Sequence, residues 1–476
     1  MSYLANVNIV SQKVFKRISE LSASMSMPVY LIGGYVRDLL LGKENDDIDF
    51  CVIGSGTDFA EALAKIYNGN CDVYLNYGTA KVGFEYEGVK FDLEFVGARR
   101  EFYKRGSRNP IVENGTLDDD MARRDFTIND MAISLCENSY GELLDPYHGR
   151  DDLLNQVIRC VSNPEERFQE DPLRMLRAIR FASRFHFKIE YETFKAIQDH
   201  AEDINIIVRE RILEELNKMI GYNEPGYGFD LLLESGLMHY ILPELEKLDE
   251  VSSINGVHHK NNFNHSIKVL NNVAEKTSDI WVRWAALLHD IGKAETKEFD
   301  RIRNVWTFYN HEEAGVQLLK IISERLGFPT DKRMSKMANL IRLHMRPTHL
   351  CSDEVSDSGI RRFIVDAGDD LEDLLILCES DLTTSHEDKK AAFLEGYRVF
   401  REKVIETEKK DNLRNMKLAF SGDDIMKVFN LKPSAVVGEI KKFVKQSFID
   451  GTVANKYEDM KELAEKWVAE HPEKMK

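Results

Sequence analysis

Two aspartates, Asp47 and Asp49, stand one residue apart in "ENDDIDFCVIG" and carry the most visible chemistry of the sequence. Asp is disfavoured in strands, yet Ile48 and the apolar residues after the pair predict a buried strand here. Side chains two apart on a strand point to the same face, so both carboxylates could bind one or two hard divalent cations. Such cations can activate an attacking hydroxyl and hold a leaving pyrophosphate. A solvated strand end is the simpler explanation of an isolated pair of this kind.

A glycine turn precedes the acid pair, in "LIGGYVRDLLLG". An apolar strand is predicted before Gly33 and Gly34, and a helix that ends at Gly42 is predicted after them. Glycines can take positive φ angles and let backbone N–H groups approach a phosphate, and Arg37 adds a positive charge one turn into the helix. These residues could hold a triphosphate, although a Gly-Gly pair is more often only a turn.

A third carboxylate is expected from the next long strand, "VKFDLEFVG". Phe91, Leu93 and Phe95 share one face of this strand, so Asp92 and Glu94 share the other. We favour Glu94 over Asp92 as the third member of a catalytic group of acids.

The stretch "EDPLRMLRAIR" predicts a helix that carries Asp171, Arg174, Arg177 and Arg180 at steps of three. Each step of three turns about 60° backwards around a helix, so the four side chains cannot all point at one small ligand. An Asp can accept the exocyclic amine of cytosine or adenine while an Arg donates to the neighbouring ring nitrogen. Uracil and guanine would leave both protein groups mispaired. A salt-bridged helix face is the alternative interpretation.

Histidines and aspartates recur in successive predicted helices of the second half of the chain. They are His265, His289, Asp290, His311, His344 and Asp381. Such side chains are good ligands for Mn, Ni, Fe or Mg. Any one of these histidines could be a buried residue satisfied by hydrogen bonds, but an adjacent His-Asp pair with three further histidines favours a metal site. The order H…HD…D resembles the HD phosphohydrolases, and the sequence leaves open whether the site hydrolyses phosphoesters.

The length of 476 residues predicts several domains, and the composition is that of an ordinary folded protein. No apolar run reaches the roughly 18 residues needed to span a bilayer, so we expect a cytoplasmic protein without membrane association. Six cysteines without a CxxC pair argue against disulfides and against Cys-ligated zinc. The net charge of −17 would repel RNA, so any RNA site must be a local basic groove, and arginines cluster in residues 99–124 and 167–184.

Short β-type runs with one helical stretch predict a small α/β unit over residues 29–159. From Pro164 the β-type signals stop, and helix-period segments follow one another to the C-terminus. The expected fold class is therefore an α/β head followed by a predominantly α-helical remainder.

Five motifs, in order along the chain, resemble the class II nucleotidyltransferase family, which contains bacterial tRNA CCA-adding enzymes and bacterial poly(A) polymerases. They are "LIGGYVRDLLLG", "DDIDF", "EFVGARRE", "RRDFTINDMA" and "EDPLRMLRAIRFASRFHF". The resemblance implies a polymerase-beta-like palm in the head and Mg²⁺ at Asp47 and Asp49, followed by a neck, an HD domain and a tail. The implied domains are a nucleotidyltransferase head at 1–160, a neck for base selection and RNA binding at 161–250, an HD domain at 251–400 and a tRNA-binding tail at 401–476.

The resemblance also implies roles for single residues of the neck. Asp171 and Arg174 match the family's base-selecting motif, and Arg177 and Arg180 are expected to contact sugar, phosphate or primer.

The segment "MARRDFTIND" is expected to contact the nucleotide and to link head and neck. The residues implied are Arg123, Arg124, Asp125 and Asn129. Many members of the family have Ala where this chain has Asp130. The polar stretch 105–119 corresponds to the loop that helps the family switch from C to A addition.

The function implied is template-independent addition of CCA to the 3′ end of tRNA from CTP and ATP. A poly(A) polymerase is the closest alternative, and an enzyme that adds only C or only A is a second. A chain that is chiefly an HD-type metal-dependent phosphohydrolase acting on RNA ends is disfavoured by the intact acid pair. The sequence leaves the oligomeric state open.

Overall fold

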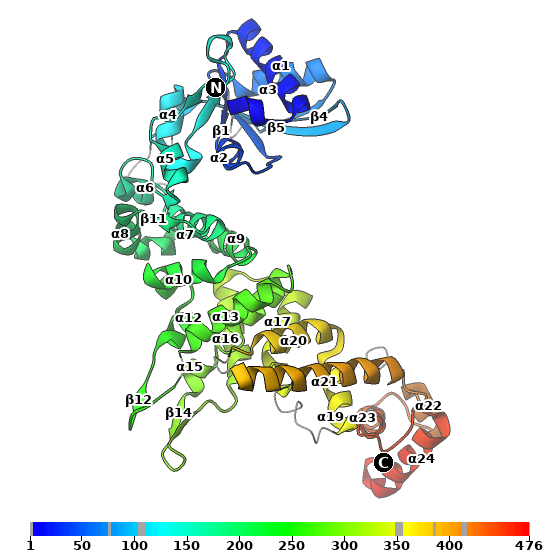
Figure 1. The fold of residues 1–476 in the computed structure, drawn as a ribbon. Helices are drawn as coiled ribbons and strands as arrows, with labels where there is room; N and C mark the ends of the chain where they lie inside the picture. Colours follow the sequence, from blue (N-terminus) through cyan, green and yellow to red (C-terminus); the bar gives the residue numbers. More distant parts are fainter. Residues whose placement is uncertain are drawn as a thin grey trace. The chain divides into compact units, whose positions relative to one another are not determined.

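The structure is a computed structural model, and contacts divide it into two units, Met1–Ile241 and Leu242–Lys476. Figure 1 shows the first unit from blue to green and the second from green to red. The residues described are 3–74, 78–102, 111–259, 261–347, 356–383, 387–411, 413 and 417–475. Part of the predicted switching loop, residues 105–110, lies outside the described residues, as does Cys351.

A seven-stranded mixed sheet in the order β3-β4-β5-β2-β1-β8-β9 forms the head. All neighbours are antiparallel except β2 and β5, which run parallel. The strands are β1 Val29–Ile32, β2 Ile48–Val52, β3 Asn70–Tyr74, β4 Thr79–Tyr86, β5 Val89–Gly97, β8 Ala132–Ser134 and β9 Leu143–Leu144. A separate antiparallel pair comprises β6 Arg99–Phe102 and β7 Ile111–Asn114.

Aromatic packing fixes which face of this sheet is the core. Phe50 on β2 stacks on Phe95 on β5 with ring centroids 4.6 Å apart. Phe15 of α1 (Ile9–Met25) and Phe59 of α3 (Gly56–Tyr67) pack against these rings. Because strand residues alternate, the residue before each central phenylalanine points to the other face. The remaining head helices are α2 Gly34–Leu40, α4 Leu117–Ala122 and α5 Gly149–Leu154.

Helices form the rest of the first unit, apart from the two-residue parallel strands β10 (Val157–Ile158) and β11 (Lys188–Ile189). They are α6 Pro164–Glu170, α7 Leu173–Phe185, α8 Tyr191–Asp199, α9 Arg209–Ile220, α10 Gly226–Glu234 and α11 Leu237–Ile241. The prediction of one helix running through Asp171 is wrong, because the chain is extended at that residue. Pro172 disfavours helical geometry at the residue before it and so separates α6 from α7.

The second unit is a helical domain with two added hairpins. Among the described residues its first helices are α12 Pro243–Glu246, α13 Asn262–Ala274, α14 Ile280–Leu288, α15 Lys293–Thr296, α16 His311–Leu326, α17 Lys332–Leu343, α19 Asp357–Ala367 and α20 Leu371–Ser380. The hairpins pair β12 Ser253–Ile254 with β13 Val257–His258, and β14 Glu298–Asp300 with β15 Val305–Thr307. These strands correct the expectation that β structure stops at Pro164.

A long helix, α21 (Glu387–Asp411), leads to three terminal helices. They are α22 Gly422–Phe429, α23 Ala435–Ile449 and α24 Tyr457–Glu470. Short 3-10 helices lie at Tyr3–Asn6, Thr127–Asn129, Glu137–Ser139, Ala201–Ile206, Lys247–Asp249, Gly368–Asp370 and Pro472–Met475. Among the described residues, no helix combines the length and the apolar character needed to cross a membrane.

Candidate active site and metal centre

Strands β2 and β5 place two of the predicted carboxylates side by side. The register of the parallel strands pairs Asp49 with Glu94. Both point away from the face that Phe50 and Phe95 bury. Asp47 lies just before β2 and is exposed, which corrects the expectation that both aspartates are strand residues. We call Asp47, Asp49 and Glu94 the carboxylate edge.

The carboxylate edge carries an excess of negative charge. Burial, followed by the charges of Asp47 and Glu94, raises the pKa of Asp49 to about 7, and Arg124 and Lys81 only partly oppose this shift. Lys81 on β4 pairs with Glu94 at 3.3 Å. Hard oxygen donors with an unbalanced negative charge are the ligands that Mg²⁺ prefers. The chemistry of this donor set therefore fits a divalent cation.

The turn at Gly33 requires glycine. Its φ is +71°, and a Cβ atom there would lie 3.4 Å from Arg124 Nη1 and 3.8 Å from Asp49 Oδ2. Only glycine adopts this conformation without strain, and it brings the backbone against the carboxylate edge. Helix α2 begins at the next residue, Gly34.

Arg37 is only 3% exposed, and its guanidinium is already bonded. Its Nε and Nη2 donate to the two carboxylate oxygens of Asp38 at 2.8 and 2.9 Å, and Nη1 donates to Asn129 Oδ1. Asp38 balances the charge of Arg37, so its attraction for a triphosphate is weaker than the sequence suggested.

Buried ion pairs hold the segment after α4. Asp120 is fully buried and pairs with Arg123 at 2.5 Å and Arg124 at 2.9 Å. Asp125 pairs with Arg177 of α7 at 2.5 Å. Although burial raises the pKa of Asp125, Arg177 brings it below its usual value, so the carboxylate stays ionised. This pair connects the head to the helix that follows Asp171.

Asp171 lies at the break between α6 and α7. Its Oδ2 accepts a hydrogen bond from Arg211 Nη2 of α9 at 2.9 Å. Arg174, on the first turn of α7, donates from Nη2 to the backbone oxygen of Arg123 at 2.8 Å and from Nη1 to Glu170 at 3.0 Å. The two residues of the predicted base-selecting pair are thus fixed by partners from three other segments.

These groups line one cleft of about 950 Å³ in the first unit. Every head and neck residue that we predict to be catalytic or nucleotide-binding lines it except Glu94. They are Gly33, Gly34, Arg37, Asp47, Asp49, Arg123, Arg124, Asp125, Asn129, Asp171, Arg174, Arg177 and Arg180. Eight arginines and one lysine line the cleft against four aspartates, so it is the local basic groove expected in an acidic chain.

The six predicted ligands of the second unit also meet. They are His265 on α13, His289 and Asp290 after α14, His311 at the start of α16, His344 after α17 and Asp381 after α20. Nδ1 of His289, His311 and His344 donates to a backbone carbonyl at 2.8, 2.8 and 2.7 Å. A carbonyl can only accept, so Nδ1 carries a proton in each ring, and Nε2 is the atom that can bind a metal once it is deprotonated.

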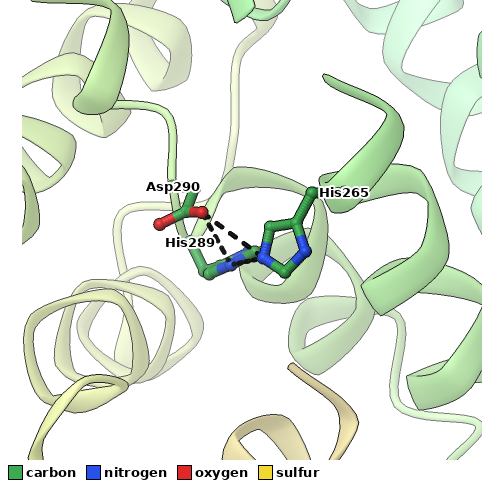
Figure 2. A group of neighbouring side chains, drawn as sticks. All are labelled: His265, His289 and Asp290. Carbon is green, nitrogen blue, oxygen red and sulfur yellow. Dashed lines mark hydrogen bonds and ion pairs between the residues drawn. The ribbon is translucent and has the colours of Figure 1, made fainter. Parts of the chain in front are cut away.

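Asp290 lies at the centre of this cluster and is 1% exposed. Its Oδ2 is 3.4 Å from His265 Nε2 and 3.3 Å from His289 Nε2, and Figure 2 shows these three side chains turned toward one another. Its Oδ1 is 3.4 Å from His311 Nε2 and 3.5 Å from His344 Nε2. Within the described residues this buried oxygen has no hydrogen-bond partner. The two oxygens of Asp290 therefore face two different pairs of imidazoles.

The buried carboxylates of the cluster shift the pKa values of their neighbours and favour a bound cation. Burial lowers the pKa of His289, but Asp290 and Asp381 raise it to about 10. Burial raises the pKa of Asp290, but the charges of His289 and Lys293 outweigh this effect and hold the pKa well below its usual value. Buried carboxylates are costly unless a positive charge compensates them, and imidazole with carboxylate is a donor set for first-row transition metals. The residues present fit a metal centre.

Three parts of the chain match known protein families. "Poly A polymerase head domain" matches residues 29–159, "Probable RNA and SrmB- binding site of polymerase A" matches 186–248, and "HD domain" matches 262–373. The first match spans the glycine turn and the carboxylate edge. The third contains all the ligands of the second-unit cluster except Asp381.

A multifunctional CCA protein of Cupriavidus metallidurans is 35% identical over 315 residues, which cover 64% of this chain and 72% of that protein. The chain belongs to the CCA-adding nucleotidyltransferase family. A second relative of the same description, from Verminephrobacter eiseniae, is 32% identical over 372 residues, or 75% of this chain and 84% of the relative. The nucleotidyltransferase head and HD domain, together with the ligand groups, imply dependence on divalent metals.

Solved structures of CCA-adding enzymes share the fold of this nucleotidyltransferase. An apo form has 21% identity and a TM-score of 0.66 and covers 94% of both chains. The Thermotoga maritima CCA-adding enzyme complexed with tRNA has 20% identity and a TM-score of 0.63 and covers 98% of this chain and 97% of that one. These matches confirm the predicted class of an α/β head with a helical remainder and an HD domain.

Several cleft residues of the nucleotidyltransferase were not singled out from the sequence. They are Asn45, Phe181, Arg184, Arg211, Asn217, Lys218, Gly221 and Tyr222. One signal was available, because Arg211 and Lys218 stand seven apart in "RERILEELNKMIG" and so share a helix face. Nothing local in the sequence indicates that this face borders Asp171.

Proposed function

We propose that the protein adds CCA to the 3′ end of tRNA, using CTP and ATP. One observation carries this proposal: a single basic cleft is lined both by Asp47 and Asp49 of the carboxylate edge and by Asp171 and Arg174. Relatives named multifunctional CCA proteins support it. So do structural neighbours described as complexes with tRNA, with ATP and with CTP.

In the proposed reaction, the 3′-hydroxyl oxygen of the RNA attacks the α-phosphorus of the nucleotide. The bond from the α-phosphorus to the bridging oxygen breaks, and pyrophosphate and the hydroxyl proton leave. Mg²⁺ held by Asp47, Asp49 and Glu94 would activate the hydroxyl and neutralise charge on the leaving group. Gly33 borders Asp49 and Arg124. The backbone at Gly33 and Gly34 and the side chain of Arg124 would hold the triphosphate.

The base would be selected by Asp171 and Arg174. A carboxylate oxygen of Asp171 accepts the exocyclic amine of C or A, and Arg174 donates to the adjacent ring nitrogen. The bonds to Arg211 and Glu170 orient the two side chains before the nucleotide arrives. U and G present an oxygen and an N–H at the same positions, which leaves both protein groups mispaired.

Single-nucleotide incorporation tests the function. The substrates are three tRNA transcripts that end before the first C, the second C and the final A, each supplied with one nucleotide at a time. We expect CTP to be used only by the first two and ATP only by the third, with UTP and GTP unused. Use of ATP alone on all three would make poly(A) synthesis the better proposal, and use of one nucleotide at one step only would indicate a partial adder.

Truncation of the base-selecting pair is expected to relax selection. Losing a charged hydrogen bond costs about 1.5–3 kcal/mol, so Asp171→Ala and Arg174→Ala should each lower discrimination against UTP roughly ten- to a hundredfold. The measurement is competitive incorporation of the four nucleotides. Asp203→Ala, at a half-buried acid of the same unit that pairs with His200 and does not line the cleft, is the control. An unchanged preference in both variants would place base selection elsewhere.

We further propose a phosphohydrolase function for the HD domain, acting on RNA ends. The observation that favours it is Asp290, whose two oxygens face separate pairs of histidines. His265, His289 and Asp381 would hold one metal and His311 and His344 a second, with Asp290 between them. Mn, Ni, Fe or Mg suits these ligands. When bound, such a pair of metals supplies an activated water and holds a phosphoester.

A further inference from the structure

Two phenylalanines on α7 contact basic side chains from two different parts of the first unit. The rings of Phe181 and Phe185 stack in parallel with centroids 6.2 Å apart. Five basic side chains lie over them. Arg177 and Arg180 lie over Phe181 at 5.6 and 4.0 Å, Lys43 and Arg184 lie over Phe185 at 5.5 and 5.0 Å, and Arg37 lies over both, at 5.7 Å from Phe181 and 4.8 Å from Phe185. The face of an aromatic ring attracts a cation electrostatically, so the ring pair holds these charges in place.

Arg37 connects the head to this ring pair. It belongs to α2, three residues after the helix begins at Gly34, whereas both phenylalanines belong to α7. Its guanidinium is buried between the ring of Phe185 and the carboxylate of Asp38. Oδ2 of Asp38 in turn lies 3.7 Å from Nη2 of Arg184 on α7. The contact between α2 and α7 is therefore made of the buried Arg37 and Asp38, the half-buried ring of Phe185 and the exposed Arg184.

The two helices joined in this way lead to the two ends of a bound nucleotide. Helix α2 starts at the glycine turn, beside Asp49. Helix α7 starts two residues after Asp171 and carries Arg174 on its first turn. The α2–α7 contact thus sets the distance from the base-selecting pair to the triphosphate end of the cleft.

We propose that Phe185, backed by Phe181, is a specificity-determining positioning residue for nucleotide addition. The inference rests on the proposed CCA-adding function and goes beyond it, because Phe185, unlike Phe181, does not line the cleft. By holding Arg37 and Lys43 against α7, its ring keeps the triphosphate site in register with Asp171 and Arg174. A nucleotide whose base does not pair is then also out of place for attack on its α-phosphorus.

The test compares Phe185→Leu with Phe185→Tyr, since leucine keeps apolar volume and tyrosine also keeps the ring face. Phe194→Leu is the matched control, because Phe194 on α8 is half-buried and, in the described part of the chain, has no cation over its ring. We expect Phe185→Leu to lower the ratio of kcat/KM for CTP to that for UTP roughly five- to tenfold, as loss of cation–π contacts implies. The KM for CTP should rise, and Phe185→Tyr and Phe194→Leu should keep the wild-type ratio.

Three results would overturn the inference: a wild-type ratio in Phe185→Leu, an equal fall in Phe185→Tyr, or an equal fall in Phe194→Leu. An equal fall in Phe194→Leu would show that loss of any aromatic ring in this unit lowers the ratio through reduced stability alone. Melting curves of all three variants are therefore measured with the kinetics. Wild-type enzyme that does not prefer CTP on the truncated tRNA would instead contradict the proposed function, so the two failures are distinguishable.

Discussion

Replacing Asp49 with asparagine is expected to reduce nucleotide addition on the order of a thousandfold, because metal-assisted charge stabilisation is worth several kcal/mol. Asparagine keeps the shape of the side chain but loses the charge that would hold a divalent cation. Asp47→Asn should behave in the same way. Binding of tRNA should change little, because the arginines that line the cleft are untouched. Steady-state addition of CMP to truncated tRNA, with tRNA affinity measured in parallel, checks both expectations.

The same substitution should not weaken the fold. The pKa of Asp49 is raised to about 7 by burial and by Asp47 and Glu94. Its ionisation therefore opposes folding increasingly as the pH rises from about 4 towards 7, and asparagine removes that cost. In EDTA at pH 8, Asp49→Asn should melt at the same temperature as the wild type or higher.

Asp92→Asn is the matched control for the carboxylate edge. Asp92 lies on β5 two residues from Glu94, and its register partner is Gly83 of β4. Addition should survive Asp92→Asn and be lost in Glu94→Gln. If both Asp47→Asn and Asp49→Asn kept more than about a tenth of wild-type turnover, the several kcal/mol assigned to the metal-binding acids would be wrong.

Replacing Asp290 with asparagine is expected to remove bound metal from the HD domain and any phosphoesterase activity with it. Both of its oxygens are used in the proposed centre, so metal content should fall from two ions per chain towards none. His311→Ala removes a ligand on one side only and should leave one ion. Elemental analysis of the purified proteins and hydrolysis of bis(p-nitrophenyl) phosphate provide the measurements.

Nucleotide addition should be unchanged in both HD variants, because Asp290 and His311 belong to the second unit and the carboxylate edge belongs to the first. His258→Ala, an exposed histidine of the same unit, should keep full metal content. Loss of CCA synthesis in folded Asp290→Asn would show that the two sites depend on each other. One ion per chain in the wild type would contradict the two-metal proposal.

The parts of the site that the sequence predicted are those set by local periodicity. Alternation along "VKFDLEFVG" places Glu94 on the face opposite Phe95, and the register of β5 with β2 then puts it beside Asp49. The histidines were predictable because they recur, together with an adjacent His-Asp pair, in successive predicted helices. In the structure, Nδ1 of His289 and of His344 meets the carbonyl three residues earlier. Helix existence was likewise predictable from apolar spacing.

The parts that escaped prediction depend on tertiary contacts. Arg37 was expected to offer a free charge, but the structure bonds it to Asn129, 92 residues away in the sequence. The partner of Asp171 is Arg211, 40 residues away. No helical or strand period links residues so distant. Only the packing of α2 against the 3-10 helix Thr127–Asn129, and of α7 against α9, reveals these pairs. The break at Asp171 has a local signal, because Pro172 disfavours helical geometry at the residue before it.

The most direct test of the central claim is the sequence of the product ends. Wild-type protein is incubated with tRNA that lacks its 3′ end and with CTP and ATP together, and the products are sequenced. The proposed cleft predicts products that end in a single CCA, and Asp49→Asn should leave the input unchanged. Long runs of A on the wild-type products, or A added without a preceding CC, would contradict the account.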